Sequence, residues 1–264
     1  MPHAQSTAHL PRILCLHGGG TNAAVFRAQM RTFIARTLAP HFRLVFFDAP
    51  FDCAPHAAIV QVYGDFAPFH RWLRWKDVHD PVDAQDCAVQ ILTGIRKAMD
   101  EDDRENYGEW AGVLGFSQGA KIAASLLWVQ ERNGRSGIPM LRRGTRFRFG
   151  VMIAGSAPLV LLDPTGELGK PPRYIETADN LTFAFEDWPE RNEGEHVLGL
   201  PTLHVHGLLD PGIERHRKLL DLYCKEGTAR LVEWNGDHRI PIKTVDVEMV
   251  SEQLLEMARE TGVL

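Results

Sequence analysis

The sequence predicts an α/β fold, with a mostly parallel β-sheet covered by helices on both faces. Apolar runs rich in β-branched and aromatic residues alternate along the chain with segments of helical periodicity, an order typical of such a sheet. The 264 residues, 44% of them hydrophobic, suffice for one domain with a sizeable core. Because there is no internal repeat, low-complexity tract or linker, we expect residues 1–264 to form a single domain.

The elements follow from these two kinds of segment. Strands are expected at six apolar runs, which are residues 9–16, 42–47, 110–116, 147–155, 200–207 and 229–234. Helices are expected where apolar residues recur at three- and four-residue spacing, at about 22–38, 83–100, 118–132, 213–226 and 245–260. In such a fold the loops at the carboxyl ends of the strands assemble the functional site.

Two long segments interrupt the alternation, residues 49–82 and 155–199. Long irregular segments in a compact domain are either functional lids or structure that the pattern does not reveal. Both segments are rich in aromatic residues, which either anchor the loops to the core or form an apolar cap over a substrate channel. The candidate substrate contacts are Phe66, Phe69, Trp72, Phe183 and Phe185.

Composition argues against several classes of function. With 29 Lys and Arg against 34 Asp and Glu, the net charge of -5 gives no general attraction to nucleic acid or to an anionic membrane. The N-terminus lacks the order of a signal peptide, and the apolar run at 149–162 is too short and broken to span a bilayer, so we expect a cytoplasmic protein. The four cysteines form no C-x-x-C pair, and we expect reduced thiols and no metal site.

The pentapeptide Gly115-Phe116-Ser117-Gln118-Gly119 lies between a predicted strand and a predicted helix. Two glycines flanking a serine on such a turn are typical of a nucleophile elbow, since bulkier side chains would collide with neighbouring elements. The alternative interpretation is a serine that only caps the helix.

A serine nucleophile needs a base and an acid that orients the base, and in this fold they follow it in the order acid, histidine. Asp210 lies just past the predicted strand 200–207, and His238 follows the Asn-Gly turn after strand 229–234. We therefore predict Ser117, Asp210 and His238 as a catalytic triad. His204 and His206 lie on a strand and suit core or supporting roles, whereas Asp237 is too close along the chain to orient His238 easily.

An acyl-transfer site also needs amide donors for the oxyanion. Gln118 N–H follows the nucleophile, and the glycine-rich loop after the first strand, His17-Gly18-Gly19-Gly20, offers a second donor. We favour Gly19 N–H, with Gly20 N–H as the alternative. Phosphate binding by this loop is disfavoured, because neither a G-x-G-x-x-G spacing nor a following Lys-Ser/Thr is present.

The motifs ILCLHGGGTNAAVF, FFDAPF, GFSQGA, HVHGLLDP and GDHRIP together resemble the fungal serine hydrolases of the α/β-hydrolase superfamily, from about residue 11 to the last helix. Within them the chain is similar to thioesterases encoded with fungal polyketide synthases, of the lovastatin and citrinin type. The resemblance implies hydrolysis of an acyl chain from a carrier-protein phosphopantetheine thioester, with Ser117 as nucleophile, Asp210 as acid and His238 as base. It implies no metal and no dissociable cofactor.

The expected substrate is therefore an acyl thioester, presented by the acyl carrier domain of a polyketide synthase. Basic residues that could dock an acidic carrier protein, or could be ordinary solvated charges, are Arg71, Arg74, Lys76, Arg142, Arg143, Arg146 and Arg148. A carboxylesterase would share the triad and differ in its leaving group. A non-enzymatic binding module would have a broken triad or no elbow, and this sequence has neither defect.

Overall fold

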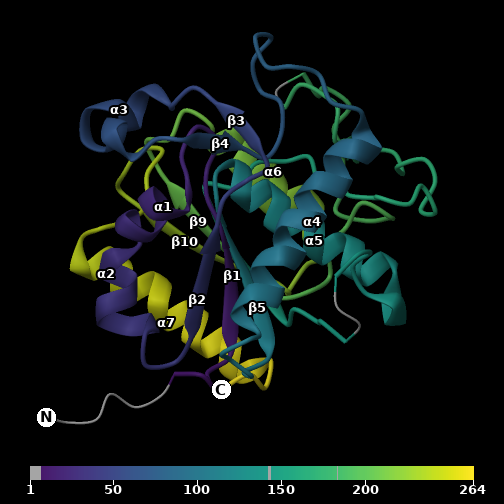
Figure 1. The fold of residues 1–264 in the computed structure, drawn as a ribbon. Helices are drawn as coiled ribbons and strands as arrows, with labels where there is room; N and C mark the ends of the chain where they lie inside the picture. Colours follow the sequence, from purple (N-terminus) through teal and green to yellow (C-terminus); the bar gives the residue numbers. More distant parts are fainter. Residues whose placement is uncertain (1–6, 142–143, 183) are drawn as a thin grey trace, which may run out of the picture.

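The structure, a computed structural model, describes residues 7–141, 144–182 and 184–264. Its centre is a six-stranded sheet of order β10-β9-β6-β5-β1-β2, in which every neighbouring pair of strands is parallel (Figure 1). The strands are β1 (Arg12–Leu16), β2 (Arg43–Phe47), β5 (Trp110–Phe116), β6 (Phe149–Ile153), β9 (Thr202–Gly207) and β10 (Ala229–Trp234). The predicted α/β fold with a parallel sheet is confirmed.

Helices cover both faces of this sheet, as Figure 1 shows. On one face lie α1 (Ala23–Gln29), α2 (Arg31–Phe33) and α7 (Thr244–Glu260). On the other face lie α4 (Ala84–Asp102), α5 (Gln118–Arg132) and α6 (Ile213–Tyr223), and a 3-10 turn at Gly134–Ser136 follows α5. Among the described helices none combines the length and the apolar character that a membrane crossing requires.

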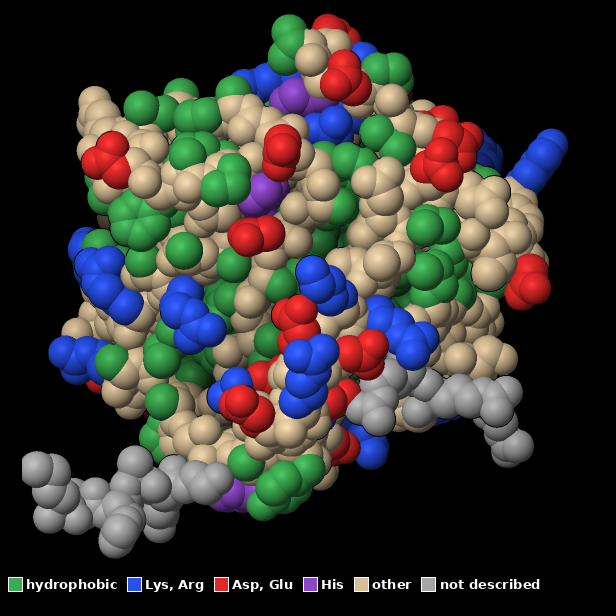
Figure 2. Space-filling view, viewed as in Figure 1, with side chains coloured by type: hydrophobic (Ala, Val, Ile, Leu, Met, Phe, Trp, Pro, Cys, Tyr) green, Lys and Arg blue, Asp and Glu red, His purple; other side chains and the backbone are tan. Residues whose placement is uncertain are grey.

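The core is divided between the two faces by the alternation of side chains along each strand. In β1, Leu14 and Leu16 pack with α4 and α5, whereas Ile13 and Cys15 pack with α1 and α7. Because both faces are covered, all five residues of β1 are buried. On the face of the molecule shown in Figure 2, acidic and basic side chains are interspersed at the surface.

The segment predicted as one helix at 22–38 is interrupted in the structure. After α1 and α2, residues Ile34–Leu38 form a π-helical turn, in which Ala39 N–H donates to Ile34 O (3.2 Å). The wider turn brings Phe33 and Leu38, five residues apart, to the same buried side. The apolar spacing predicted the helix but not this change of pitch.

Residues 49–82 contain structure that the sequence did not predict. They form an antiparallel hairpin of β3 (Phe51–Cys53) and β4 (Phe69–Arg71), with α3 (Ala57–Tyr63) and a 3-10 turn (Gly64–Phe66) between the two strands. In Figure 1 this unit lies at the top of the molecule. Gly20 N–H donates to His70 O (2.9 Å) and His70 N–H donates to Thr21 O (2.8 Å), so the unit is joined to the loop after β1.

Residues 155–199 carry two short parallel strands, β7 (Val160–Leu161) and β8 (Glu176–Thr177). Val160 N–H donates to Ser125 Oγ of α5 (2.9 Å), and the Tyr223 hydroxyl of α6 donates to Tyr174 O (2.8 Å). Part of this segment is thus fixed against the helix that follows Ser117.

A buried ion pair strengthens this attachment. Lys121 Nζ on α5 lies 2.8 Å from Glu176 Oε2 on β8, and the two side chains are only 1% and 3% exposed. Burial lowers the pKa of Lys121 and raises the pKa of Glu176, and each charge offsets the effect on the other. The pair therefore tolerates loss of both charges better than loss of one.

We expect Lys121→Met to lower the free energy of unfolding by about 3–5 kcal/mol, because it leaves the Glu176 carboxylate buried without its lysine partner. Adding Glu176→Leu should recover most of that loss. Urea unfolding of the single and double variants measures both effects. If the double variant were as unstable as the single one, the unpaired charge would not be the cause.

Candidate active site

Ser117 lies on the sharp turn between β5 and α5. Its backbone has a φ of 53° and a ψ of -116°, a conformation that residues other than glycine rarely adopt. A Cβ at Gly115 would collide with the carbonyl of Gly119, and a Cβ at Gly119 would collide with the carbonyl of Leu16. Both glycines are therefore required for the turn, which holds the Ser117 side chain partly exposed.

The Ser117 side chain makes no capping hydrogen bond, although the residue occupies the N-cap position of α5. Its Oγ lies 2.9 Å from His238 Nε2. The interpretation of Ser117 as a serine that only caps the helix is therefore wrong. The hydroxyl faces a base instead.

Asp210 and His238 reach Ser117 from the loops after β9 and β10. Asp210 Oδ2 lies 2.7 Å from His238 Nδ1, and Asp210 Oδ1 accepts the Gly212 N–H (2.7 Å). Burial of Asp210 alone would raise its pKa, but the hydrogen bonds from His238 and Gly212 hold that pKa below its usual value. The three predicted residues thus form a continuous row from carboxylate to imidazole to hydroxyl, whose donor and acceptor pattern suits proton transfer.

His216 on α6 is a neighbour of this row that sequence reasoning missed. Its Nδ1 lies 3.8 Å from Asp210 Oδ2, its side chain is 1% exposed, and burial lowers its pKa to about 4. Within the described part of the chain, Asp210, His216 and His238 alone have metal-ligand atoms close enough to share an ion. The 2.7 Å between Asp210 and His238 is shorter than the separation of about 3.3 Å between ligands of tetrahedral zinc, so the spacing fits a hydrogen bond better.

The glycine-rich loop after β1 lies beside Ser117. Gly20 N–H already donates to His70 O (2.9 Å), so this amide is not free to face an oxyanion. Of the two donors considered, Gly19 N–H is therefore the one that the backbone hydrogen bond of Gly20 leaves as the candidate. A Cβ at Gly19 would lie 3.0 Å from the Trp75 ring, so this ring packs closely against the loop. His17 fixes the loop from inside, with Nδ1 2.7 Å from Gly18 O and Nε2 accepting the Ala49 N–H (3.0 Å).

Gln118 has a second role that the sequence did not reveal. Its side-chain Oε1 accepts the N–H groups of Trp72 (2.7 Å) and Leu73 (3.1 Å), and its Nε2 donates to Leu73 O (3.0 Å). The residue after Ser117 therefore holds the segment that leads to Trp75, which packs against Gly19. A glutamine on the first turn of a helix carries no sequence signal for such a long-range contact.

We expect Gln118→Leu to lower kcat/KM about tenfold or more, because it leaves two amides and one carbonyl of residues 72 and 73 without partners beside the glycine-rich loop. Gln130 is a matched control. It is a buried glutamine on the same helix, and it bonds the backbone of Phe147 in the same way, away from Ser117. Gln130→Leu should lower the unfolding temperature but keep kcat/KM per folded molecule; equal losses of activity would contradict the assignment.

The predicted substrate contacts lie in different surroundings. Phe66 is 45% exposed, Phe69 is buried in β4, and Phe185 is partly buried with its ring centroid 5.0 Å from that of Trp188. Trp72 is completely buried and donates its indole N–H to His17 O (2.7 Å). Its ring therefore supports the glycine-rich loop after β1 from the core rather than lining a channel. Phe183 lies outside the described residues.

The basic residues considered for docking also differ from one another. Arg71 is 4% exposed and so is not a surface charge. The Arg74 guanidinium donates to the carbonyls of His79 and Asp77, within its own loop. Lys76, Arg146 and Arg148 are exposed, whereas Arg142 and Arg143 lie outside the described residues.

The chain is similar to known proteins of one family. The family model described as "Serine hydrolase (FSH1)" matches residues 6–250. The Monascus ruber protein named Esterase pigG is 52% identical over 264 residues, which cover 98% of this chain and 95% of that protein. The Penicillium crustosum protein named Esterase claE is 46% identical over 260 residues, which cover 98% of this chain and 96% of that protein.

Solved structures support the same fold at lower similarity. An acyl-protein thioesterase 2 from Zea mays matches with a TM-score of 0.53 and 15% identity, over 95% of this chain and 94% of that one. A carboxylesterase from Mesorhizobium loti matches with a TM-score of 0.50 and 15% identity, over 93% and 88% of the two chains. These likenesses establish the α/β-hydrolase architecture. Because the family model and the relatives span nearly all of its length, the chain belongs to the serine hydrolase (FSH1) family.

Proposed function

We propose that this protein is a thioesterase that releases a polyketide-like acyl chain from a carrier-protein thioester through an acyl-serine intermediate. The observation that carries the proposal is the hydrogen-bonded row of Ser117, His238 and Asp210 beside the glycine-rich loop. Membership in a serine hydrolase family supports the hydrolytic class of the reaction. The choice of a thioester rests on the resemblance of the motifs to synthase-associated thioesterases.

In the proposed reaction His238 Nε2 removes the proton of Ser117 while Oγ attacks the acyl carbonyl carbon. The oxyanion that forms is held by the amides of Gln118 and Gly19. His238 then gives the proton to the sulfur as the carbon–sulfur bond breaks, and the thiol leaves. Water, deprotonated by His238, attacks the acyl-serine and releases the free acid, while Asp210 keeps the imidazole in the tautomer with its proton on Nδ1.

These steps use side chains and backbone amides alone, so we expect no requirement for a metal or a cofactor. The acyl group would lie against aromatic side chains of the insertion at 49–82 that reach the surface, such as the exposed Phe66 and the partly buried Trp75. The proposal has two further parts. The two insertions, at 49–82 and 155–199, form a cap over the acyl chain. The partner is the acyl carrier domain of a polyketide synthase.

The alternative is a general carboxylesterase acting on small or medium oxoesters. Its support is the word "esterase" in the names of relatives that match nearly the whole chain. The triad and the oxyanion loop serve both reactions equally, because the two differ in the leaving group.

Matched thioesters and oxoesters over a range of acyl lengths distinguish the two functions, assayed with the wild-type protein and with Ser117→Ala. The proposal expects Ser117-dependent cleavage with a higher kcat/KM for long or polyketide-like thioesters. Equal or better cleavage of short oxoesters would favour the carboxylesterase. Full activity of the Ser117→Ala protein would exclude both.

A further inference from the structure

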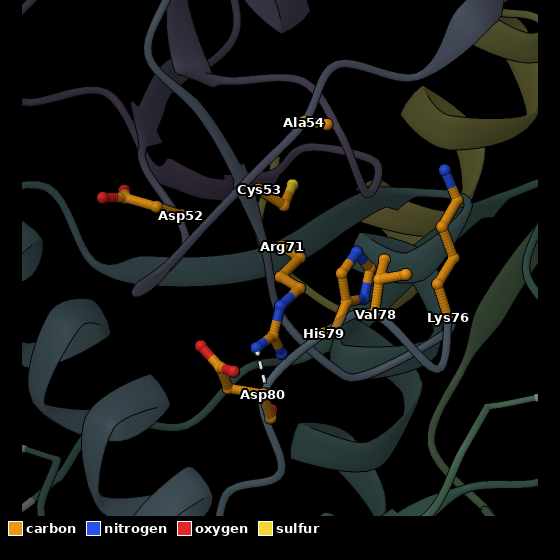
Figure 3. A pocket seen from close by; sticks show the side chains of 8 residues that line it. All are labelled: Asp52, Cys53, Ala54, Arg71, Lys76, Val78, His79 and Asp80. Atoms are coloured by element: carbon orange, nitrogen blue, oxygen red, sulfur yellow. Dashed lines mark hydrogen bonds between the residues drawn. The ribbon is translucent and has the colours of Figure 1, made fainter.

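A cavity of about 210 Å³ lies between the β3–β4 hairpin and the loop that follows β4. Its volume is several times the roughly 30 Å³ that a water molecule occupies in the liquid, so a phosphate or carboxylate group has room in it. Charged and polar side chains share its wall with the apolar Ala54 and Val78, as Figure 3 shows. The lining residues are Asp52, Cys53, Ala54, Arg71, Lys76, Val78, His79 and Asp80.

Arg71 is the unusual member of this wall. It is 4% exposed, its guanidinium donates a long hydrogen bond to Asp80 O (3.3 Å), and its Nε has no hydrogen-bond partner. In the described part of the chain no carboxylate lies within 4.0 Å of this guanidinium. Arg12, equally buried, has carboxylate oxygens of Asp102 at 3.2 Å and Asp103 at 2.5 Å. A buried guanidinium with unused donors is costly unless an anion completes it.

The other charged side chains of the wall do not pair with the Arg71 guanidinium. Asp52 turns away from the group in Figure 3, and its carboxylate lies 3.0 Å from His70 Nδ1. Asp80 carries its carboxylate beside Arg71 but outside ion-pair distance, and it is exposed to solvent. Lys76 is exposed at the side of the cavity and adds a second cation.

The cavity adjoins the candidate active site through short links. His56, three residues after Cys53, donates its N–H to Gly20 O (2.9 Å). The His79 ring lies against Trp75, with ring centroids 4.3 Å apart, and Trp75 is the ring that packs on Gly19. Burial lowers the pKa of His56, and the nearby His238 and Lys76 lower it further. Through His79 and Trp75 the wall of the cavity is therefore joined to the glycine-rich loop beside Ser117.

We propose that this cavity binds an anionic oxygen group of the substrate, with Arg71 as the residue that receives it. The inference rests on the proposed thioesterase function, which supplies such a group as the phosphate of a phosphopantetheine leaving group. A guanidinium with free N–H groups matches phosphate oxygens in geometry and charge. A carboxylate on the acyl group would have the same chemistry and is the second source to be tested.

The test compares thioesters that carry one acyl group on three leaving groups, N-acetylcysteamine, pantetheine and 4′-phosphopantetheine. In the wild-type protein the KM for the phosphorylated thioester should be about tenfold lower than for the pantetheine thioester, as expected for one charge-assisted contact. Arg71→Met should bring the ratio of the two KM values close to one. A fourth substrate, an N-acetylcysteamine thioester whose acyl chain ends in a carboxylate, tests the acyl side.

Arg31→Met is the matched control, since it removes the same charge from an exposed position on α2, on the opposite face of the sheet. It should leave the ratio of KM values as it is in the wild-type protein. A second variant replaces Arg71→Met if that protein does not fold. Lys76→Met, at the exposed side of the cavity, should then reduce the tenfold preference for the phosphorylated thioester but not abolish it. Free 4′-phosphopantetheine should then inhibit the wild-type protein more strongly than pantetheine does, and inorganic phosphate should weaken that difference.

Two results would overturn the inference. The first is equal KM values for the phosphorylated and unphosphorylated thioesters, with no inhibition by free 4′-phosphopantetheine beyond that of pantetheine. The second is a preference that Arg31→Met reduces as much as Arg71→Met does, because net charge would then explain it. An Arg71-dependent preference confined to the carboxylate-bearing acyl chain would overturn the phosphate assignment and keep the anion site. Cleavage of oxoesters but of none of the thioesters would instead refute the proposed function.

Discussion

Replacing Ser117 by alanine is expected to lower kcat by roughly 10⁵- to 10⁶-fold while the protein stays folded. The Ser117 Oγ is the hydroxyl hydrogen-bonded to His238 Nε2, at 2.9 Å, and alanine offers no nucleophile in its place. Alanine keeps the Cβ at a φ of 53°, so the strain of the turn is unchanged, and one hydrogen bond is worth only about 1 kcal/mol. Steady-state hydrolysis and a thermal unfolding curve of the same preparation measure both quantities.

Ser125 on the same helix is the matched control. Its hydroxyl donates to Lys121 O (2.8 Å) and accepts the Val160 N–H (2.9 Å), so it serves the packing of β7 and not the site. Ser125→Ala should lower the unfolding temperature and leave kcat nearly unchanged. The opposite pattern, with activity lost in Ser125→Ala and kept in Ser117→Ala, would rule out Ser117 as the nucleophile.

The four inner strands of the central sheet were predictable because they are buried on both faces. A strand such as β5, buried at all seven positions, must be apolar along its whole length, and that is visible in the sequence. The hairpin of β3 and β4 was not predictable. Its strands have three residues each, which is too short to show an alternating pattern. The helix α3 between them buries none of its side chains, so it has no apolar face that the sequence could reveal. Long-range hydrogen bonds to the loop after β1 place this unit.

The same contrast holds within the site. Ser117, Asp210 and His238 lie on the loops that follow β5, β9 and β10, so the topology of a parallel sheet brings them to one edge. Gln118, Trp72 and Arg71 do not follow from that rule. Their roles depend on which side of the hairpin faces the glycine-rich loop after β1, and local sequence does not encode this. The aromatic and basic residues of 49–82 could therefore be noticed in the sequence but not divided into buried and exposed sets.

Replacing Asp210 by asparagine is expected to lower kcat roughly 10⁴-fold, an effect of the imidazole tautomer. Asp210 Oδ1 accepts the Gly212 N–H at 2.7 Å, so the amide oxygen of an asparagine must take that position. Its NH₂ group then faces His238 Nδ1, where Oδ2 now stands at 2.7 Å. The imidazole must then adopt the other tautomer, with the lone pair on Nδ1 facing that NH₂ and the proton on Nε2. A protonated Nε2 can no longer accept the proton of Ser117.

Asp237→Asn is the control for this effect, because it removes a different carboxylate next to His238. The Asp237 carboxylate lies 3.1 Å from Arg239 Nε at the surface, so its loss should change kcat little. In the double variant Ser117→Ala with Asp210→Asn, kcat should fall no further than with Ser117→Ala alone, because an aspartate that acts only through His238 has no function once the nucleophile is gone. Additive losses would mean that Asp210 acts on the substrate by another route, and the row from Asp210 to Ser117 would have to be abandoned as the catalytic unit.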